Sequence, residues 1–131
     1  MPRMITGAHV LLNSTNPEAD RAYFRDVLGF PNVDVGGGWL IFKLPPAELA
    51  VHPTDKKTRQ RHAGHRMLGA VLYLMCKDLR ATIRTLKSKR AACTKVAKEA
   101  WGIRTTIKLP SGGEIGLYQP SHPTALGLEA S

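Results

Sequence analysis

An internal repeat constrains the fold of this chain more than any other feature of its sequence. Residues 43–52 read KLPPAELAVH, and residues 108–118 read KLPSGGEIGLY. Each run begins with Lys-Leu-Pro, passes through a short turn to a glutamate, and then alternates small with aliphatic residues. Such self-similarity indicates two copies of one supersecondary unit of about 60 residues. The 131 residues of the chain fit one domain built from that pair.

The first copy has the pattern of a strand, a helix and three further strands. An apolar run over residues 5–13 predicts the first strand. Asn16 and Pro17 are typical of a helix start, an apolar stripe at helical spacing follows, and Gly29 predicts the end of the helix. Three short strands joined by tight turns are then expected over residues 33–35, 39–44 and 48–52.

The second copy repeats this order after residues 54–66, a polar and basic stretch that we interpret as an exposed linker. A strand is expected over residues 67–76, and Asp78 caps the helix that follows. Three more strands are expected over residues 93–96, 103–109 and 114–118. The sequence thus predicts an α+β fold of two βαβββ modules in pseudo-twofold repeat: module one over 4–53, the linker 54–66, module two over 67–120 and a tail over 121–131.

The composition argues against a membrane protein and against a disulfide-stabilised one. The longest near-apolar stretch, residues 67–76, is far shorter than the roughly 20 residues that span a bilayer. Residues 1–7 lack the apolar core of a signal peptide. The two cysteines, Cys76 and Cys93, are interpreted as small buried hydrophobic residues in the reduced state. We therefore expect a cytoplasmic protein with no membrane partner.

The charge balance raises a different question. Lysine and arginine outnumber aspartate and glutamate by 19 to 10, a formal net charge of +9, and most of the excess follows Lys56. A balance of this kind invites a nucleic-acid partner. Basic residues at helical spacing, however, more often form a solvated face, so a nucleic acid is a less favoured partner than a small molecule or a second copy of the chain.

Three short motifs within the repeat resemble those of a known protein family. A strand carries Gly7-Ala8-His9, a helix ends with the run FRDVLGF over residues 24–30, and the last strand closes with GLYQP over residues 116–120. In this order, on paired βαβββ modules, the motifs resemble the vicinal oxygen chelate superfamily, which contains glyoxalase I, extradiol dioxygenases and bleomycin resistance proteins. The resemblance implies mixed sheets that curl around a cavity. By analogy with relatives that complete their cavities by pairing chains, it also implies a homodimer.

The resemblance further implies where a metal ion would be held. Metal-dependent members place one ligand on the first and one on the fourth strand of each module, usually His or Gln and then Glu. His9 matches the first of these positions. Val71 (or Ala70, if the register shifts by one residue), Ala50 and Gly116 match the other three and cannot coordinate. Three of the four inherited positions have therefore lost their ligands, which predicts that no metal cofactor is bound.

A shifted set of ligands is the alternative. Side chains alternate along a strand, so Glu48 and His52 share a face with Ala50. In the same way, Glu114 and Tyr118 share a face with Gly116. His9, His52 and Glu114 would then form a set of two histidines and one carboxylate, which suits Fe, Mn, Ni or Zn. In that case Glu114 would act as ligand or as catalytic base.

Small residues at the inherited positions predict an open pocket rather than a metal centre. Aromatic side chains on or beside these strands would line it and stack flat molecules, although packing in the core or a dimer contact is their alternative role. The predicted ligand pocket consists of His9, Trp39, Phe42, Glu48, Ala50, His52, Trp101, Glu114, Gly116 and Tyr118.

Three functions remain open from the sequence. The first is a pocket protein that sequesters a small-molecule ligand, as a resistance protein does. The second is a metal-dependent enzyme, either a lyase of the glyoxalase type or a ring-cleaving dioxygenase. The third is a basic protein that binds nucleic acid or another polyanion.

Overall fold

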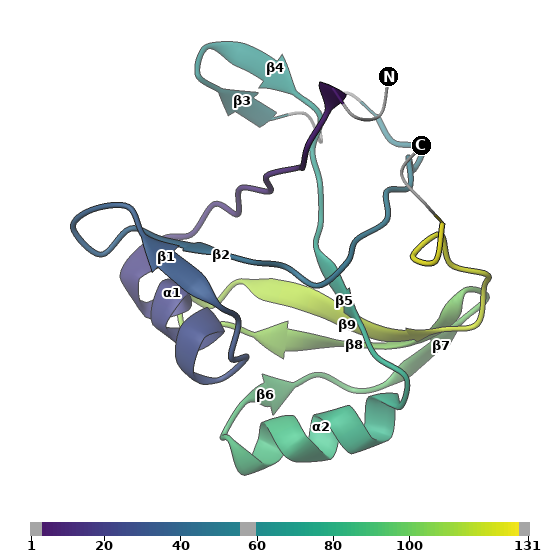
Figure 1. Ribbon diagram of the computed structural model, residues 1–131. Helices are drawn as coiled ribbons and strands as arrows, with labels where there is room; N and C mark the ends of the chain where they lie inside the picture. The colour runs from purple at the N-terminus through teal and green to yellow at the C-terminus, as the bar shows by residue number, and fades with distance from the viewer. Residues whose placement is uncertain (1–3, 56–59, 129–131) are drawn as a thin grey trace.

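The computed structural model describes residues 4–55 and 60–128 (Figure 1). These residues form an α+β fold, as the sequence predicts, with one mixed sheet and two separate hairpins. The elements are α1 (Pro17–Asp26), β1 (Asn32–Asp34), β2 (Leu40–Phe42), β3 (Gln60–His62), β4 (His65–Met67), β5 (Tyr73–Met75), α2 (Leu79–Ser88), β6 (Ala92–Cys93), β7 (Ala97–Glu99), β8 (Gly102–Lys108) and β9 (Glu114–Pro120).

The second module forms the main sheet, which has five strands. Its order is β5-β9-β8-β6, and β7 pairs with the first three residues of β8, Gly102 to Arg104. β5 runs parallel to β9, with Tyr73 beside Gly116, whereas the other pairs are antiparallel. Ile107 of β8 is fully buried, and Ile115 and Leu117 of β9 are nearly so. This sheet contains most of the core.

Helix α2 covers one face of that sheet. Asp78 caps it, since its carboxylate accepts a hydrogen bond from the backbone N–H of Ala81 at 3.0 Å. Leu79 and Leu86, two turns apart on one side, are buried in the same cluster as Ile107. The apolar stripe thus fixes the helix to the sheet and leaves its basic side chains in solvent.

Helix α1 begins where the sequence predicts and ends at Asp26, slightly before the predicted end at Gly29. The side chain of Asn16 accepts from the N–H of Ala19, Pro17 occupies the first turn, and Gly29 follows the helix with φ of +71°. Phe24 is buried against the rings of Phe30 and Phe42, at centroid distances of 5.9 and 5.6 Å.

A buried carboxylate ties α1 to the second module. Asp20, only 6% exposed, accepts hydrogen bonds from the N–H of Ser111 at 3.0 Å and from its hydroxyl at 2.7 Å. The hydroxyl of Ser14 donates a third, also at 2.7 Å. Because Ser111 lies in the turn between β8 and β9, these bonds hold the first helix against the main sheet.

The prediction of two strands in the first module is wrong, because these strands do not form within the single chain. Residues 5–13 and 48–52 form no strand, although the hairpin of β1 and β2 forms close to the predicted positions. Both segments keep their strand-like sequence but have no neighbouring strand within the described chain with which to pair, so their apolar side chains stay exposed. The first module is thus a helix and a hairpin, not a complete βαβββ unit.

The predicted linker also differs from expectation. Its second part forms the hairpin of β3 and β4, in which Ala63 and Gly64 both have positive φ, 51° and 81°. That geometry suits the two-residue turn favoured in hairpins. Residues 56–59, the basic start of the linker, lie outside the described residues. The second module gains a further short strand, β7, that the sequence did not predict.

Two smaller expectations concern the cysteines and the helices. Cys76 and Cys93 are both free and half-buried, and burial raises the pKa of each thiol above its usual value. Among the residues described, neither helix is long and apolar enough to cross a membrane.

Candidate functional site

The face of the main sheet opposite α2 carries the candidate site. Along β9, Ile115 and Leu117 point to the core cluster under α2. Glu114, Gly116 and Tyr118 alternate with them and lie on the opposite face, which confirms the shared face that the sequence predicts for these three residues. Adjacent strands add Tyr73 beside Gly116 and place Arg104 opposite Tyr118.

Three aromatic side chains meet on this face, and we call them the aromatic cluster: Tyr73, Trp101 and Tyr118. Their rings contact one another edge to face, with centroids 5.6 Å apart for Tyr73–Trp101 and Tyr73–Tyr118 and 5.2 Å apart for Trp101–Tyr118. Tyr118 is buried, whereas Tyr73 and Trp101 are 38% and 37% exposed. The cluster therefore combines one buried ring with two rings that present open surface.

A polar group borders the aromatic cluster at Tyr118. The phenol oxygen of Tyr118 lies 3.0 Å from Nε2 of His122, whose ring stacks beside it. Nδ1 of His122 lies 2.7 Å from the carbonyl oxygen of Pro123, which can only accept. In the neutral ring Nδ1 therefore carries the proton, and Nε2 accepts the hydrogen bond from the Tyr118 hydroxyl.

Glu48 completes the polar group and comes from the other module. Its Oε2 lies 3.9 Å from Nε2 of His122, and its Oε1 accepts a hydrogen bond from the N–H of Ala125 at 2.8 Å. Segment 44–53 is thereby tied to the tail over residues 121–128. Burial raises the pKa of the Tyr118 phenol, and the negative charge of Glu48 raises it further, so Tyr118 remains a hydrogen-bond donor at neutral pH.

The expected space at Gly116 is filled from within the chain. A Cβ atom at this position would overlap the ring of Tyr73, whose Cγ would be only 2.7 Å away. The small residue at the inherited ligand position thus admits a neighbouring aromatic ring rather than leaving room for a ligand. Stacking surface and hydrogen-bonding groups remain at the exposed rim of the cluster.

The structure brings together four of the predicted pocket residues: Glu48, Trp101, Gly116 and Tyr118. The other six lie apart from them within this chain. Phe42 packs in the core, Trp39 contacts the guanidinium of Arg21, Glu114 bonds to the hydroxyl of Thr106, and His9, Ala50 and His52 are exposed.

The alternative metal site is not assembled within one copy of the chain. Across residues 4–55 and 60–128, no three His, Cys, Asp or Glu side chains gather closely enough to hold a metal ion. His9, His52 and Glu114 are each exposed in separate segments. The donor set present at the aromatic cluster, His122 and Glu48, is engaged in hydrogen bonds to the protein.

Two residues of the site were missed in the sequence. Tyr73 lies inside the predicted strand over residues 67–76, and its position was visible only as an aromatic residue within an aliphatic run. Parallel pairing of β5 with β9 is what places it on Gly116. His122 follows the second module in a tail with no periodic pattern, so the sequence offered no signal for it.

No model of a protein family matches the chain, and no curated protein matches its sequence. Solved structures do match it. TnmS3, an antibiotic binding protein from Streptomyces sp. CB03234, superposes with a TM-score of 0.59 at 21% identity, over 89% of this chain and 98% of that chain. Lactoylglutathione lyase from Agrobacterium tumefaciens superposes with a TM-score of 0.58 at 13% identity, over 88% of this chain and 93% of that chain.

A third match names the fold directly. A member of the glyoxalase/bleomycin resistance protein/dioxygenase superfamily from Sphaerobacter thermophilus superposes with a TM-score of 0.53 at 20% identity, over 88% of this chain and 98% of that chain. The chain therefore has the fold of this superfamily, as its resemblance to the vicinal oxygen chelate superfamily predicts. Matches at such low identity establish the fold alone.

Proposed function

We propose that this protein binds and sequesters a small organic molecule, without covalent chemistry, at the aromatic cluster. The observation that carries the proposal is the pair of half-exposed rings, Tyr73 and Trp101, beside the hydrogen-bonding group of Tyr118, His122 and Glu48. Apolar rings with a few placed polar groups are what small-molecule sites consist of. The antibiotic binding protein TnmS3, which shares this fold, supports the same kind of role.

The proposed ligand is flat, largely apolar and carries at least one polar group. Its rings would stack on Trp101 and Tyr73, while a hydrogen-bond donor on the ligand would reach the carboxylate of Glu48. Because the histidine and the carboxylate at the cluster already bond to the protein, we propose that binding needs no metal ion. The proposed place of action is the cytoplasm.

We further propose that the working form is a homodimer. Large apolar side chains are exposed along the segments that lack a strand partner: Met4, Ile5, Val10, Leu11, Leu12, Leu49, Val51, Leu68 and Val71. β5 is also an edge strand of the described sheet, so its outer backbone groups are free of sheet hydrogen bonds there. A second copy would pair with these edges, cover the apolar side chains and enclose the aromatic cluster.

Titration with antibiotics tests the binding proposal, and the two tryptophans provide a matched pair of variants. Bleomycin and a flat quinone antibiotic are added to the wild type, to Trp39→Phe and to Trp101→Ala, and binding is measured by calorimetry and by quenching of tryptophan fluorescence. We expect Trp39→Phe to bind the antibiotic as the wild type does, with quenching of the remaining tryptophan fluorescence. We expect Trp101→Ala to bind the antibiotic about tenfold more weakly.

Equal affinity in Trp101→Ala and the wild type would remove the aromatic cluster from the proposal. Elemental analysis of protein purified without chelator is the second control. About one equivalent of Fe, Mn, Ni or Zn, lost in His9→Ala, would favour a metal-dependent lyase or dioxygenase instead.

Sedimentation tests the dimer separately. We expect the wild type to sediment at twice 14.3 kDa, and Leu49→Asp combined with Val51→Asp to sediment as a monomer. A charge buried in an apolar interface costs far more than one in water. The control, Thr54→Asp, adds a charge to the same segment but replaces no apolar side chain.

A further inference from the structure

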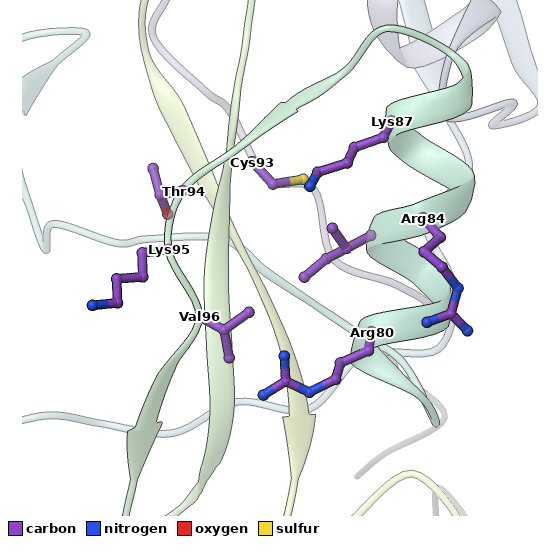
Figure 2. A pocket seen from close by; sticks show the side chains of 8 residues that line it. Arg80, Arg84, Lys87, Cys93, Thr94, Lys95 and Val96 are labelled. Atoms are coloured by element: carbon purple, nitrogen blue, oxygen red, sulfur yellow. The ribbon is translucent and has the colours of Figure 1, made fainter.

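A groove on the other side of the molecule is separate from the aromatic cluster. It lies between α2 and the chain from β6 toward β7, at the edge of the main sheet, and has a volume of about 430 Å³ (Figure 2). That volume falls within the range of small-molecule pockets. The groove is lined by Arg80, Ile83, Arg84, Lys87, Cys93, Thr94, Lys95 and Val96.

Positive charge dominates the rim of this groove. Arg80, Arg84 and Lys87 follow one another at helical spacing along α2, and Lys95 lies on the opposite wall. Residues 79–98 contain seven lysines and arginines and no acidic residue. The ion pairs found among residues 4–55 and 60–128, which are Arg25–Asp26 and Arg104–Glu99, involve none of the groove's basic side chains, and neither does the contact of His122 with Glu48.

The floor of the groove is apolar and half-buried. Ile83 and Val96 pack against the core cluster, and so does Cys93. Figure 2 shows the side chains of Arg80 and Lys87 extending from α2 toward Val96 and Cys93, near opposite ends of the groove. The hydroxyl of Thr94 is already bonded to Thr106, at 2.9 Å, so the strongest hydrogen-bonding side chains that the groove offers to a ligand are the cationic ones.

We propose that this groove is a second ligand site, and that its ligand is an organic anion. The body of the ligand would be apolar and lie on Ile83 and Val96. Its acidic group, a carboxylate, phosphate or sulfonate, would bind Arg80 or Lys87, because guanidinium and ammonium groups donate strong hydrogen bonds to such oxygens. The absence of aromatic side chains among the lining residues argues against stacked nucleic-acid bases as the occupant.

A pair of dyes that differ only in charge tests this proposal. Anilinonaphthalene sulfonate carries one sulfonate, and phenylnaphthylamine has the same rings without it. Both are titrated by fluorescence into the wild type and into Arg80→Gln combined with Lys87→Gln. Both residues are exposed, so the variant is expected to fold, and circular dichroism checks that it does.

We expect the charge-removal variant to bind the sulfonate dye about tenfold more weakly and the neutral dye unchanged. Added salt should lower the affinity of the wild type for the sulfonate dye, because salt screens exposed charges. Two controls bracket the result. Arg80→Lys combined with Lys87→Arg keeps the charge and should keep the affinity, and Arg61→Gln combined with Arg66→Gln removes the same charge from the distant hairpin of β3 and β4.

Unchanged sulfonate affinity in the charge-removal variant would overturn the proposal, as would an equal loss for both dyes. Binding of duplex DNA that weakens in the charge-removal variant, with no change for the sulfonate dye, would also overturn it and indicate a polyanion surface. Trp101→Ala should leave the sulfonate dye unaffected, which separates this site from the aromatic cluster.

Discussion

The second module, residues 67–120, buries its sheet, whereas the first module, residues 4–53, leaves much of its apolar surface in solvent. Within the described part of the chain, eight of the nine buried hydrophobic residues lie between Leu79 and Tyr118, and the first module contributes only Phe24. Leu49 and Val51, on the segment that repeats β9 in sequence, are 92% and 87% exposed. Two copies of one sequence pattern thus reach different states in the same chain.

A strand pattern therefore forms a strand only where an edge is available. β9 lies between β5 and β8 and satisfies its backbone on both sides. Residues 48–52 have no such neighbours in the described chain, so their alternating side chains have no sheet on which to be arranged. Substitutions in the two modules can test how far this contrast extends.

Core substitutions should separate the two modules most strongly. Ile107→Ala removes a fully buried side chain and is expected to lower the free energy of unfolding by about 2–5 kcal/mol. Leu49→Ala should change the stability of the monomer by less than about 0.5 kcal/mol. Denaturant unfolding at low protein concentration measures both, and equal losses would mean that the contrast between the modules is wrong.

The link between the modules should have the next largest effect. Asp20→Ala leaves Ser14 and Ser111 without their shared acceptor, and we expect a loss of about 3 kcal/mol, since hydrogen bonds to a charged group contribute more than neutral ones. Glu18→Ala, an exposed carboxylate on the same helix, is the control. Hydrogen exchange should show α1 opening before α2 in Asp20→Ala, and joint opening would contradict this role.

The sequence predicted both helices, their capping residues and the shared face of β9, because these depend on local patterns. Asn16 and Asp78 cap helices wherever those helices pack. The sequence could not predict which strands find partners, and it missed Tyr73 and His122, since both reach the site through contacts with residues distant in the sequence or in an irregular tail. Four of the ten predicted pocket residues lie at the cluster because they share β9 or border it.

A larger side chain at Gly116 should destabilise the protein far more than one at Ala50, the equivalent position in the first module. Gly116→Ala forces a methyl group against the Tyr73 ring, with an expected loss of about 1–3 kcal/mol. Ala50→Ser, at the equivalent exposed position, should be neutral. In a double-mutant cycle, Tyr73→Ala should relieve much of the loss at Gly116, and strictly additive effects would mean that the two residues do not touch.

Two tyrosine hydroxyls, one in each module, should respond in opposite directions. The Tyr23 hydroxyl is buried and has no hydrogen-bond partner among the described residues, so Tyr23→Phe should raise the free energy of unfolding by up to about 1 kcal/mol. Tyr118→Phe loses the bond to His122 and should lower it by about the same amount. Chemical denaturation of the two variants side by side distinguishes them, and a loss in both would mean that Tyr23 has a partner.

The same tyrosines predict a weak dependence on alkaline pH. Burial raises the pKa of both phenols above their ordinary value of 10.0, and the charge on Cys93 raises that of Tyr23 further. A raised pKa in the folded state means that stability is constant below pH 10 and falls as the pH rises beyond it. Absorbance of the phenolate should show that some tyrosines ionise at a higher pH than free tyrosine does, and Tyr118→Phe should reduce the size of this high-pH step. Ionisation of every tyrosine at the ordinary pKa would contradict this prediction.

The parallel pairing of β5 with β9 also bears on how the polypeptide is made. β5 appears early in the second module, yet it pairs with the last strand, more than 40 residues later. On the ribosome the sheet cannot form completely until β9 has emerged. The unpaired apolar segments of the first module remain exposed to solvent during this time. Nascent chains should therefore engage chaperones until synthesis passes β9, and translation halted before it should yield insoluble product.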